Sequence, residues 1–156
     1  MAFGTGSHPT TRLCLEWLER SVRPGASLLD YGCGSGVLAI AAGRLGASEV
    51  VGVDIDPQAV AVARENAVAN GVVARFQESA DQLDGQFDIV VANILANPLR
   101  VLAPALCSHL RPGSLLALSG ILVEQSDDLI EAYAPYLSLA VVDTREGWVC
   151  LAGSRN

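Results

Sequence analysis

A short apolar stretch that runs into an acid and three alternating glycines constrains this chain more than any other feature. The segment reads Leu28-Leu29-Asp30-Tyr31-Gly32-Cys33-Gly34-Ser35-Gly36 and is followed by helix-forming sequence. Glycine allows a tight turn with positive φ and leaves no Cβ in the way of a ligand. A strand, a glycine loop and the N-terminus of a helix together form a cradle of nucleotide size. The sequence therefore predicts a nucleotide-type site on an α/β fold.

The spacing of the glycines separates two kinds of cradle. Dinucleotide-binding loops follow the pattern G-x-G-x-x-G, but here the glycines stand at positions 32, 34 and 36, and Val37 occupies the place of the third. The pattern D-x-G-x-G-x-G resembles the first motif of the class I S-adenosylmethionine-dependent methyltransferases. That resemblance implies a loop that wraps a nucleoside carrying an amino acid and holds no pyrophosphate. The spacing thus disfavours a nicotinamide oxidoreductase.

Composition limits the class of protein. The 156 residues, 51% of them hydrophobic, suit one well-buried domain and argue against disorder. No apolar run reaches the ~18 residues of a membrane helix, and no signal peptide is visible. The four cysteines form no C-x-x-C pair, which indicates reduced thiols in a cytoplasmic protein and no metal site. The net charge of −7 disfavours direct contact with nucleic acid and is compatible with a basic partner protein.

The order of the expected elements is that of a doubly wound sheet. A helix at 10–20 precedes strands at 27–31, 49–54, 74–77, 87–92 and 115–119, the last after a turn at Pro112-Gly113. Helices follow at 37–45, from Pro57 to Asn70-Gly71, at 98–110 and at 123–134, and strands at 137–144 and 148–152 close a hairpin about Glu146-Gly147. These units predict an α/β fold with a mostly parallel seven-stranded sheet, to which the hairpin adds one antiparallel strand.

Asp54 is the candidate ribose ligand. It stands at the carboxyl end of the second predicted strand, twenty-two residues beyond Gly32, and doubly wound sheets bind ligands at the carboxyl ends of their strands. An acid there accepts both ribose hydroxyls. The alternative, a helix-capping Asp, is already provided by Asp56 before Pro57. Asp30 is expected to brace the amides of the glycine loop or to lie near the ligand's sulfur through a water.

Asn93 follows the fourth predicted strand directly, in the run Asn93-Ile94-Leu95-Ala96. Because that strand ends beside the first, Asn93 should face the reactive end of a ligand on the glycine loop. Its amide oxygen and a neighbouring backbone carbonyl accept the hydrogens of an amine and aim the nitrogen lone pair at a methyl group. The alternative is a turn-forming Asn that only closes the strand.

Two polar segments leave alternatives open. The run Ala2 to Thr11 is interpreted as a lid over the methionine end of the ligand, with His8 as a candidate general base, or as a segment in which Thr10 or His8 caps the first helix. Three side chains after the third predicted strand are candidates to contact adenine, or are simply solvated: Glu78, Ser79 and Asp81.

Five segments together resemble the catalytic domain of the bacterial ribosomal protein L11 methyltransferase (PrmA) family. They are Ala2 to Thr11, Asp30 to Gly36, Gly52 to Ala59, Val91 to Ala96 and Leu118 to Leu122, so the likeness extends over essentially the whole chain. The glycine loop and Asp54 are common to the superfamily, whereas the first run and the Asn-Ile-Leu-Ala block are narrower. The resemblance implies S-adenosylmethionine contacts at Thr11, Gly32, Asp54 and Asn93, and the loop adds Gly34.

The expected activity is transfer of a methyl group from S-adenosylmethionine to protein amino groups, on a Lys side chain or an N-terminus. The resemblance implies a basic ribosomal protein as substrate, and we expect a cytoplasmic monomer. Family members carry a separate N-terminal recognition domain, whereas residues 1–156 are expected to form a single domain without it. Two alternatives stay open: another acceptor, such as a small molecule, a glutamine amide or a nucleobase, or a cofactor-binding module without independent activity. The Asn-Pro-Pro-Tyr motif usual in the nucleic-acid and glutamine enzymes is missing after the fourth strand.

Overall fold

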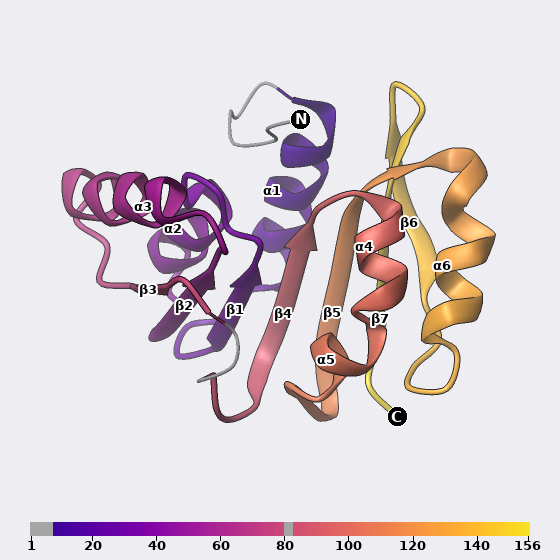
Figure 1. Cartoon of the computed structure of the whole chain (residues 1–156). Coiled ribbons are helices and arrows are strands. Elements are labelled where there is room, and N and C mark those ends of the chain that lie inside the picture. Colours follow the sequence, from indigo (N-terminus) through magenta and orange to yellow (C-terminus); the bar gives the residue numbers. More distant parts are fainter. Residues whose placement is uncertain (1–7, 80–82) are drawn as a thin grey trace.

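The computed structural model describes residues 8–79 and 83–156. A seven-stranded sheet with the order β3-β2-β1-β4-β5-β7-β6 runs through the molecule (Figure 1). The first five strands in this order pair in parallel, and β7 is antiparallel to both of its neighbours. This confirms the predicted α/β, doubly wound sheet with one antiparallel strand from the C-terminal hairpin. The strands are β1 (Ser27–Tyr31), β2 (Glu49–Val53), β3 (Arg75–Gln77), β4 (Phe87–Asn93), β5 (Leu110–Leu122), β6 (Ala140–Arg145) and β7 (Trp148–Ser154).

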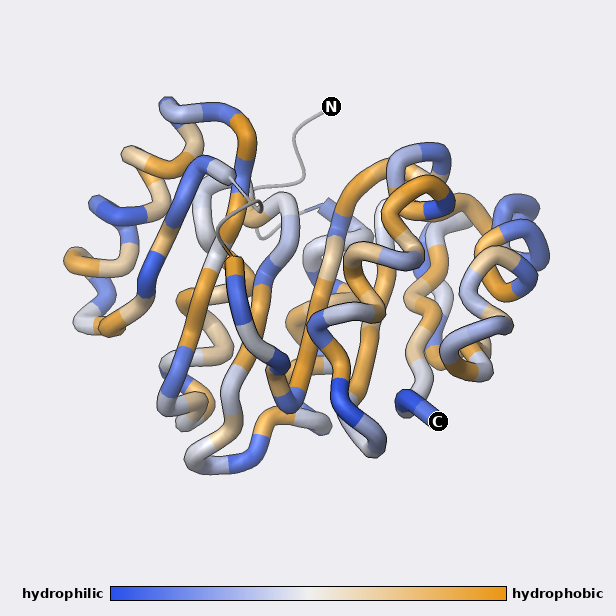
Figure 2. The backbone as a smooth tube through the Cα atoms, turned by 60° about the horizontal axis from the view of Figure 1, so that its bottom comes forward, coloured by the Kyte–Doolittle hydropathy of each residue, from blue (hydrophilic) through white to orange (hydrophobic). Residues whose placement is uncertain are grey.

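Helices cover both faces of the sheet (Figure 1). One face carries α1 (Pro9–Ser21), α2 (Val37–Arg44) and α3 (Pro57–Ala69), and the other carries α4 (Ala96–Val101), α5 (Ala103–Cys107), the short 3-10 helix η1 (Val123–Gln125) and α6 (Ser126–Tyr133). Successive strand residues point to opposite faces, so Leu28 packs in the α1–α3 core and Leu29 in the α4–α6 core. The central strands are therefore mostly apolar, as the orange stretches of Figure 2 show, and Asp30 in β1 and Asp88 in β4 are polar exceptions.

Three predicted boundaries were wrong for identifiable reasons. The helix expected at 98–110 is broken at Leu102 into α4 and α5, because Pro104 has no N–H to continue the ladder. Pro112-Gly113 makes no turn before a strand; it lies in a bulge inside the longer β5, where the register with β4 shifts. The first strand of the hairpin begins at Ala140, three residues later than expected, and Leu137 makes only an isolated bridge.

The hairpin turn itself is confirmed. Glu146 and Gly147 have φ of 52° and 86°, the two positive values that a type I′ turn requires. In the centre of the sheet, β1 lies between β2 and β4. Because the chain turns in opposite directions on either side of β1, a crevice opens at the carboxyl ends of these three strands.

Candidate functional site

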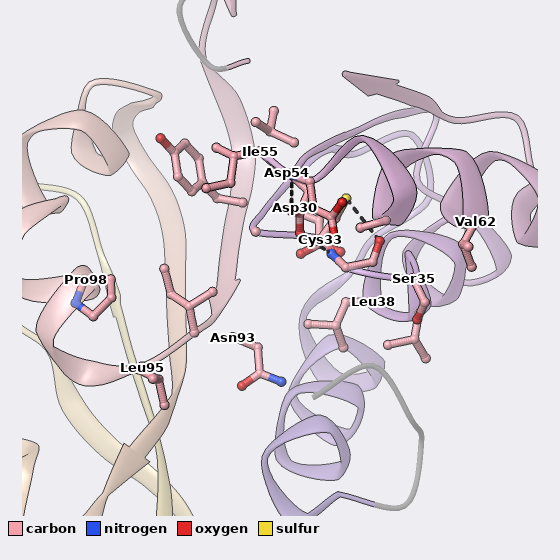
Figure 3. A pocket seen from close by; sticks show the side chains of 18 of the residues that line it. Asp30, Cys33, Ser35, Leu38, Asp54, Ile55, Val62, Asn93, Leu95 and Pro98 are labelled. Carbon is pink, nitrogen blue, oxygen red and sulfur yellow. Dashed lines mark hydrogen bonds between the residues drawn. The ribbon is translucent and has the colours of Figure 1, made fainter. Parts of the chain in front are cut away.

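A cavity of about 840 Å³ occupies this crevice (Figure 3). Its size is within the range of small-molecule and cofactor sites. Four of the predicted site residues line it together: Gly32, Gly34, Asp54 and Asn93. Asp30 lies in the same wall, below the glycine loop.

The glycine loop turns from β1 towards the end of β2. Gly32, Gly34 and Gly36 have φ of +76°, +54° and +86°, a region that side chains with a Cβ rarely adopt. The amide of Gly32 donates to the Val53 carbonyl at 2.7 Å, which holds the loop against β2. A Cβ at Gly34 would meet no atom within 4 Å. At Gly34 the loop therefore presents bare backbone to open space, as a ligand cradle requires.

Asp30 anchors the helix that follows the loop. Gly36 is the N-cap of α2 and has no side chain that could accept from the free amides of the helix. Asp30 of β1 takes this role, because its Oδ2 accepts from the Ala39 amide at 3.1 Å. Burial raises the pKa of Asp30 to about 7, the Ala39 hydrogen bond opposes the rise, and the nearby Asp54 charge adds to it. Asp30 thus braces the helix and not the loop amides, and the alternative that it lies near the ligand's sulfur through a water stays a prediction.

The loop is braced by Asp54 instead. Its Oδ2 accepts from the Gly34 amide at 2.8 Å and its Oδ1 from the Asp56 amide at 3.0 Å. Asp56 accepts from the Gln58 amide at 2.9 Å, which confirms it as the cap of α3. A carboxylate offers about four lone-pair sites. Two of them are used within the chain, so the others are available to hydroxyl groups in the cavity.

Asn93 ends β4 on the other side of the loop. Its side chain is only 8% exposed, and within the described part of the chain its Oδ1 has no hydrogen-bond donor. Burying an acceptor without a partner costs free energy, so this oxygen is open to a donor that the described residues do not supply. Figure 3 shows the amide between the wall of Leu95 and Pro98 and the wall of Asp30 and Leu38.

Sequence reasoning missed the apolar part of the cavity. Ile55 is 88% exposed and Leu95 is 48% exposed, although both are large aliphatic side chains. Both line the cavity, together with Tyr31, Pro98 and Leu102. The sequence did contain one sign of this apolar wall. Ile55 is a large apolar residue between Asp54 and Asp56, the cap of α3, at a position where no buried side chain was expected. Apolar walls of this kind suit a flat heterocycle.

The predicted N-terminal segment is only partly described, since Ala2 to Ser7 lie outside the described residues. His8 is the N-cap of α1, because its Nδ1 accepts from the Thr10 amide at 3.2 Å. Its ring also packs edge-on against Trp148, with centroids 5.4 Å apart. Thr11 is fully buried in α1 and does not line the cavity. The capping interpretation of His8 is confirmed, and the cofactor contact of Thr11 stays a prediction.

Two of the three candidates for adenine recognition lie away from the lining of the cavity. Glu78 and Ser79 are exposed and do not line it, and Asp81 lies outside the described residues.

Among the described residues no cluster of three His, Cys, Asp or Glu side chains could hold a metal ion, and no helix is long and apolar enough to cross a membrane. The four cysteines are buried free thiols, and burial raises the pKa of Cys33 within the loop, which makes it a poor nucleophile.

Comparison with known proteins identifies the family of this chain. The family model described as ribosomal protein L11 methyltransferase (PrmA) matches residues 1–156. A protein of Dechloromonas aromatica with that name is 69% identical over 153 residues, which are 98% of this chain and 52% of the relative. Its counterpart in Burkholderia mallei is 57% identical over 155 residues, 99% of this chain and 52% of that protein. The chain therefore spans about half the length of these curated relatives.

A solved structure leads to the same family. The crystal structure of ribosomal protein L11 methylase from Lactobacillus delbrueckii subsp. bulgaricus superimposes with a TM-score of 0.90 at 38% identity, covering 97% of this chain and 81% of that one. Sequence and fold thus match over nearly the whole chain. The chain belongs to the ribosomal protein L11 methyltransferase (PrmA) family.

Proposed function

We propose that this chain is the catalytic domain of an S-adenosylmethionine-dependent protein N-methyltransferase that acts on amino groups of ribosomal protein L11. The names of its relatives support the substrate. One observation supports the chemistry: the buried oxygen of Asn93, which has no donor among residues 8–79 and 83–156, lies in the same cavity as the glycine loop and Asp54. A single ligand on the loop would then present its reactive end to Asn93.

Each part of the cavity fits a part of S-adenosylmethionine. The two unused lone-pair sites of the Asp54 carboxylate suit the ribose hydroxyls. The bare backbone at Gly34 allows close approach of the ligand, and Gly32 lines the same cavity. Ile55 and Leu95 offer apolar walls for the adenine ring. Contacts of these residues with the cofactor are part of the proposal.

When bound, S-adenosylmethionine supplies a methyl group on a positively charged sulfur, which is already an activated donor. The chain's own residues hold the acceptor in line and keep water away. A lysine amine, with an ordinary pKa of about 10.4, must reach the site neutral. The Asn93 oxygen then accepts an N–H of that amine and directs the nitrogen lone pair into the cavity. The surplus proton passes to water, so this role requires no dedicated base.

The charge of the chain suits such a substrate. A net charge of −7 favours encounter with a basic protein over nucleic acid. We propose that the chain works as a cytoplasmic monomer. We also propose that residues 1–156 form one cofactor-binding domain, because all seven strands join one sheet, and that the additional length of the relatives recognises the substrate.

The test has two stages. The chain is first titrated calorimetrically with S-adenosylmethionine, S-adenosylhomocysteine and NAD, and only the first two should bind. It is then incubated with S-adenosylmethionine and purified ribosomal protein L11, and intact-mass analysis counts the added methyl groups. A full-length relative serves as the positive control for the substrate. Binding of NAD alone would overturn the cofactor, and binding of S-adenosylmethionine without methyl transfer by this chain, while the relative methylates, would favour a module without independent activity.

A further inference from the structure

A bulge interrupts β5 beside the end of β4. The register of β5 with β7 moves from Leu118 opposite Leu151 to Ile121 opposite Val149. Two residues of β5, Ser119 and Gly120, therefore face a single residue of β7. The Ser119 hydroxyl donates to the Val149 carbonyl at 2.8 Å across this bulge, and Gly120 has φ of +88°.

The bulge brings Gly120 against the peptide that follows Asn93. A Cβ at Gly120 would lie 2.2 Å from the carbonyl oxygen of Ile94, 2.7 Å from its carbonyl carbon and 3.1 Å from its nitrogen. Real Cβ atoms do not approach backbone so closely, so any side chain at position 120 must displace Ile94. The Ile94 peptide can occupy its observed position only because residue 120 has no side chain.

Ile94 also lies close to a second glycine, Gly32. A Cβ at Gly32 would lie 2.7 Å from Cγ2 of Ile94. Ile94 is thus held between Gly120 of β5, which contacts its backbone, and Gly32 of the loop, which contacts its side chain. Both Ile94 and Asn93 line the cavity, and Asn93 is the register partner of Ser119.

We propose that Gly120 is a positioning residue for the methyl acceptor: it sets the Asn93-Ile94 peptide, and through it the oxygens that receive the amine. The inference rests on the proposed function and deepens it. Because Gly120 acts through Ile94 and lies on β5, away from Asp54 and the α3 side of the cavity, its loss should affect turnover more than cofactor binding. A misplacement of about 1 Å is enough to lower turnover by about a hundredfold.

Two alanine variants in the same strand isolate this effect. Gly120→Ala and Gly113→Ala impose the same backbone strain, since φ is +88° and +89°, but a Cβ at Gly113 meets nothing within 4 Å. We expect kcat for methylation of ribosomal protein L11 to fall about a hundredfold in Gly120→Ala, with an unchanged Kd for S-adenosylhomocysteine. Gly113→Ala should keep the parent's kcat. Equal kcat in the two variants would overturn the proposal.

A spectroscopic readout separates this proposal from the function on which it rests. The side-chain amide resonances of Asn93 should shift in Gly120→Ala and stay in place in Gly113→Ala, whether or not the chain turns over. If the parent neither binds S-adenosylhomocysteine nor methylates, the proposed function fails, while unmoved Asn93 resonances would overturn the positioning role alone.

If Gly120→Ala does not fold, Ser119→Ala takes its place, because it releases the bulge without adding volume. Lower kcat at an unchanged Kd supports the proposal, and an unchanged kcat overturns it.

Discussion

The carboxylate of Asp54 accepts a hydrogen bond of 2.8 Å from the backbone amide of Gly34. The side chain proposed to bind ribose therefore also fixes the loop on which the rest of the ligand would lie. Its second oxygen is held by the Asp56 amide at 3.0 Å, so the carboxylate is oriented before any ligand arrives. Orienting a binding group in advance reduces the entropy lost on binding.

Replacing Asp54 by Ala should weaken binding of S-adenosylmethionine about ten- to a hundredfold, equivalent to about 1.5–3 kcal/mol. The variant loses both the ribose contacts and the brace on Gly34. Calorimetric titration measures the change, and Glu65→Ala is the matched control, because Glu65 is an exposed acid on α3 outside the cavity. An Asp54→Ala protein that binds as tightly as the Glu65→Ala protein would refute the ribose assignment.

The elements around the cavity were predictable because their signals are local. The apolar run at β1, the glycines after it and the cap at Asp56 each specify a conformation through neighbouring residues alone. Strand β1 was predicted with its observed limits, and Asp56 caps α3 as expected. Asn93 was placed beside the glycine loop because β4 had to pair with β1, which it does.

The features that escaped prediction depend on pairing between distant segments. The bulges at Gly113 and Gly120 appear only when β5 is aligned with β4 and β7. Asp30 was expected to brace the loop amides but accepts from the Ala39 amide of α2, and the bracing of Gly34 by Asp54 was not predicted, because such contacts depend on how the loop folds back over the ends of β1 and β2. The exposed Ile55 is invisible to a periodic pattern, since it belongs to no helix or strand.

Gly32→Ala should weaken cofactor binding and also lower stability. The added Cβ would lie 2.7 Å from Cγ2 of Ile94, and φ of +76° strains any side chain. Gly25→Ala is the control, because Gly25 has φ of +86° and its Cβ would meet nothing within 4 Å. Both variants should lose about 1 kcal/mol of stability to strain, measured by urea unfolding. Only Gly32→Ala should lose affinity for S-adenosylhomocysteine, and equal affinities would show that the loop is not the cradle.

Asn93→Ala should lower kcat far more than it weakens cofactor binding. An interaction expressed mainly in the transition state lowers kcat and leaves ground-state affinity nearly intact. The expected loss is about a hundredfold in kcat. Asn97→Ala is the control of the same residue type, since Asn97 is exposed on α4 and does not line the cavity. Equal losses in kcat and in affinity for S-adenosylhomocysteine would make Asn93 a cofactor ligand.

Asp30 should make the stability of the fold depend on pH. Burial raises its pKa from 3.8 to about 7 in the folded protein. Between these values the unfolded chain has released a proton that the folded protein still holds. The free energy of unfolding therefore falls as the pH rises through this interval and levels off above the folded pKa.

The Asp30→Asn variant isolates this contribution. Its amide oxygen still accepts from the Ala39 amide, the hydrogen bond that Asp30 makes at 3.1 Å, but it no longer ionises. The free energy of unfolding of the variant minus that of the parent should therefore rise by about 2 kcal/mol when the pH is raised from 5.5 to 8. Urea titration at each pH measures this difference. Glu19→Gln removes the same charge from an exposed position on α1 and serves as control. A stability difference between Asp30→Asn and the parent that does not change with pH would mean that Asp30 is ionised throughout, and that its bond to Ala39 outweighs its burial.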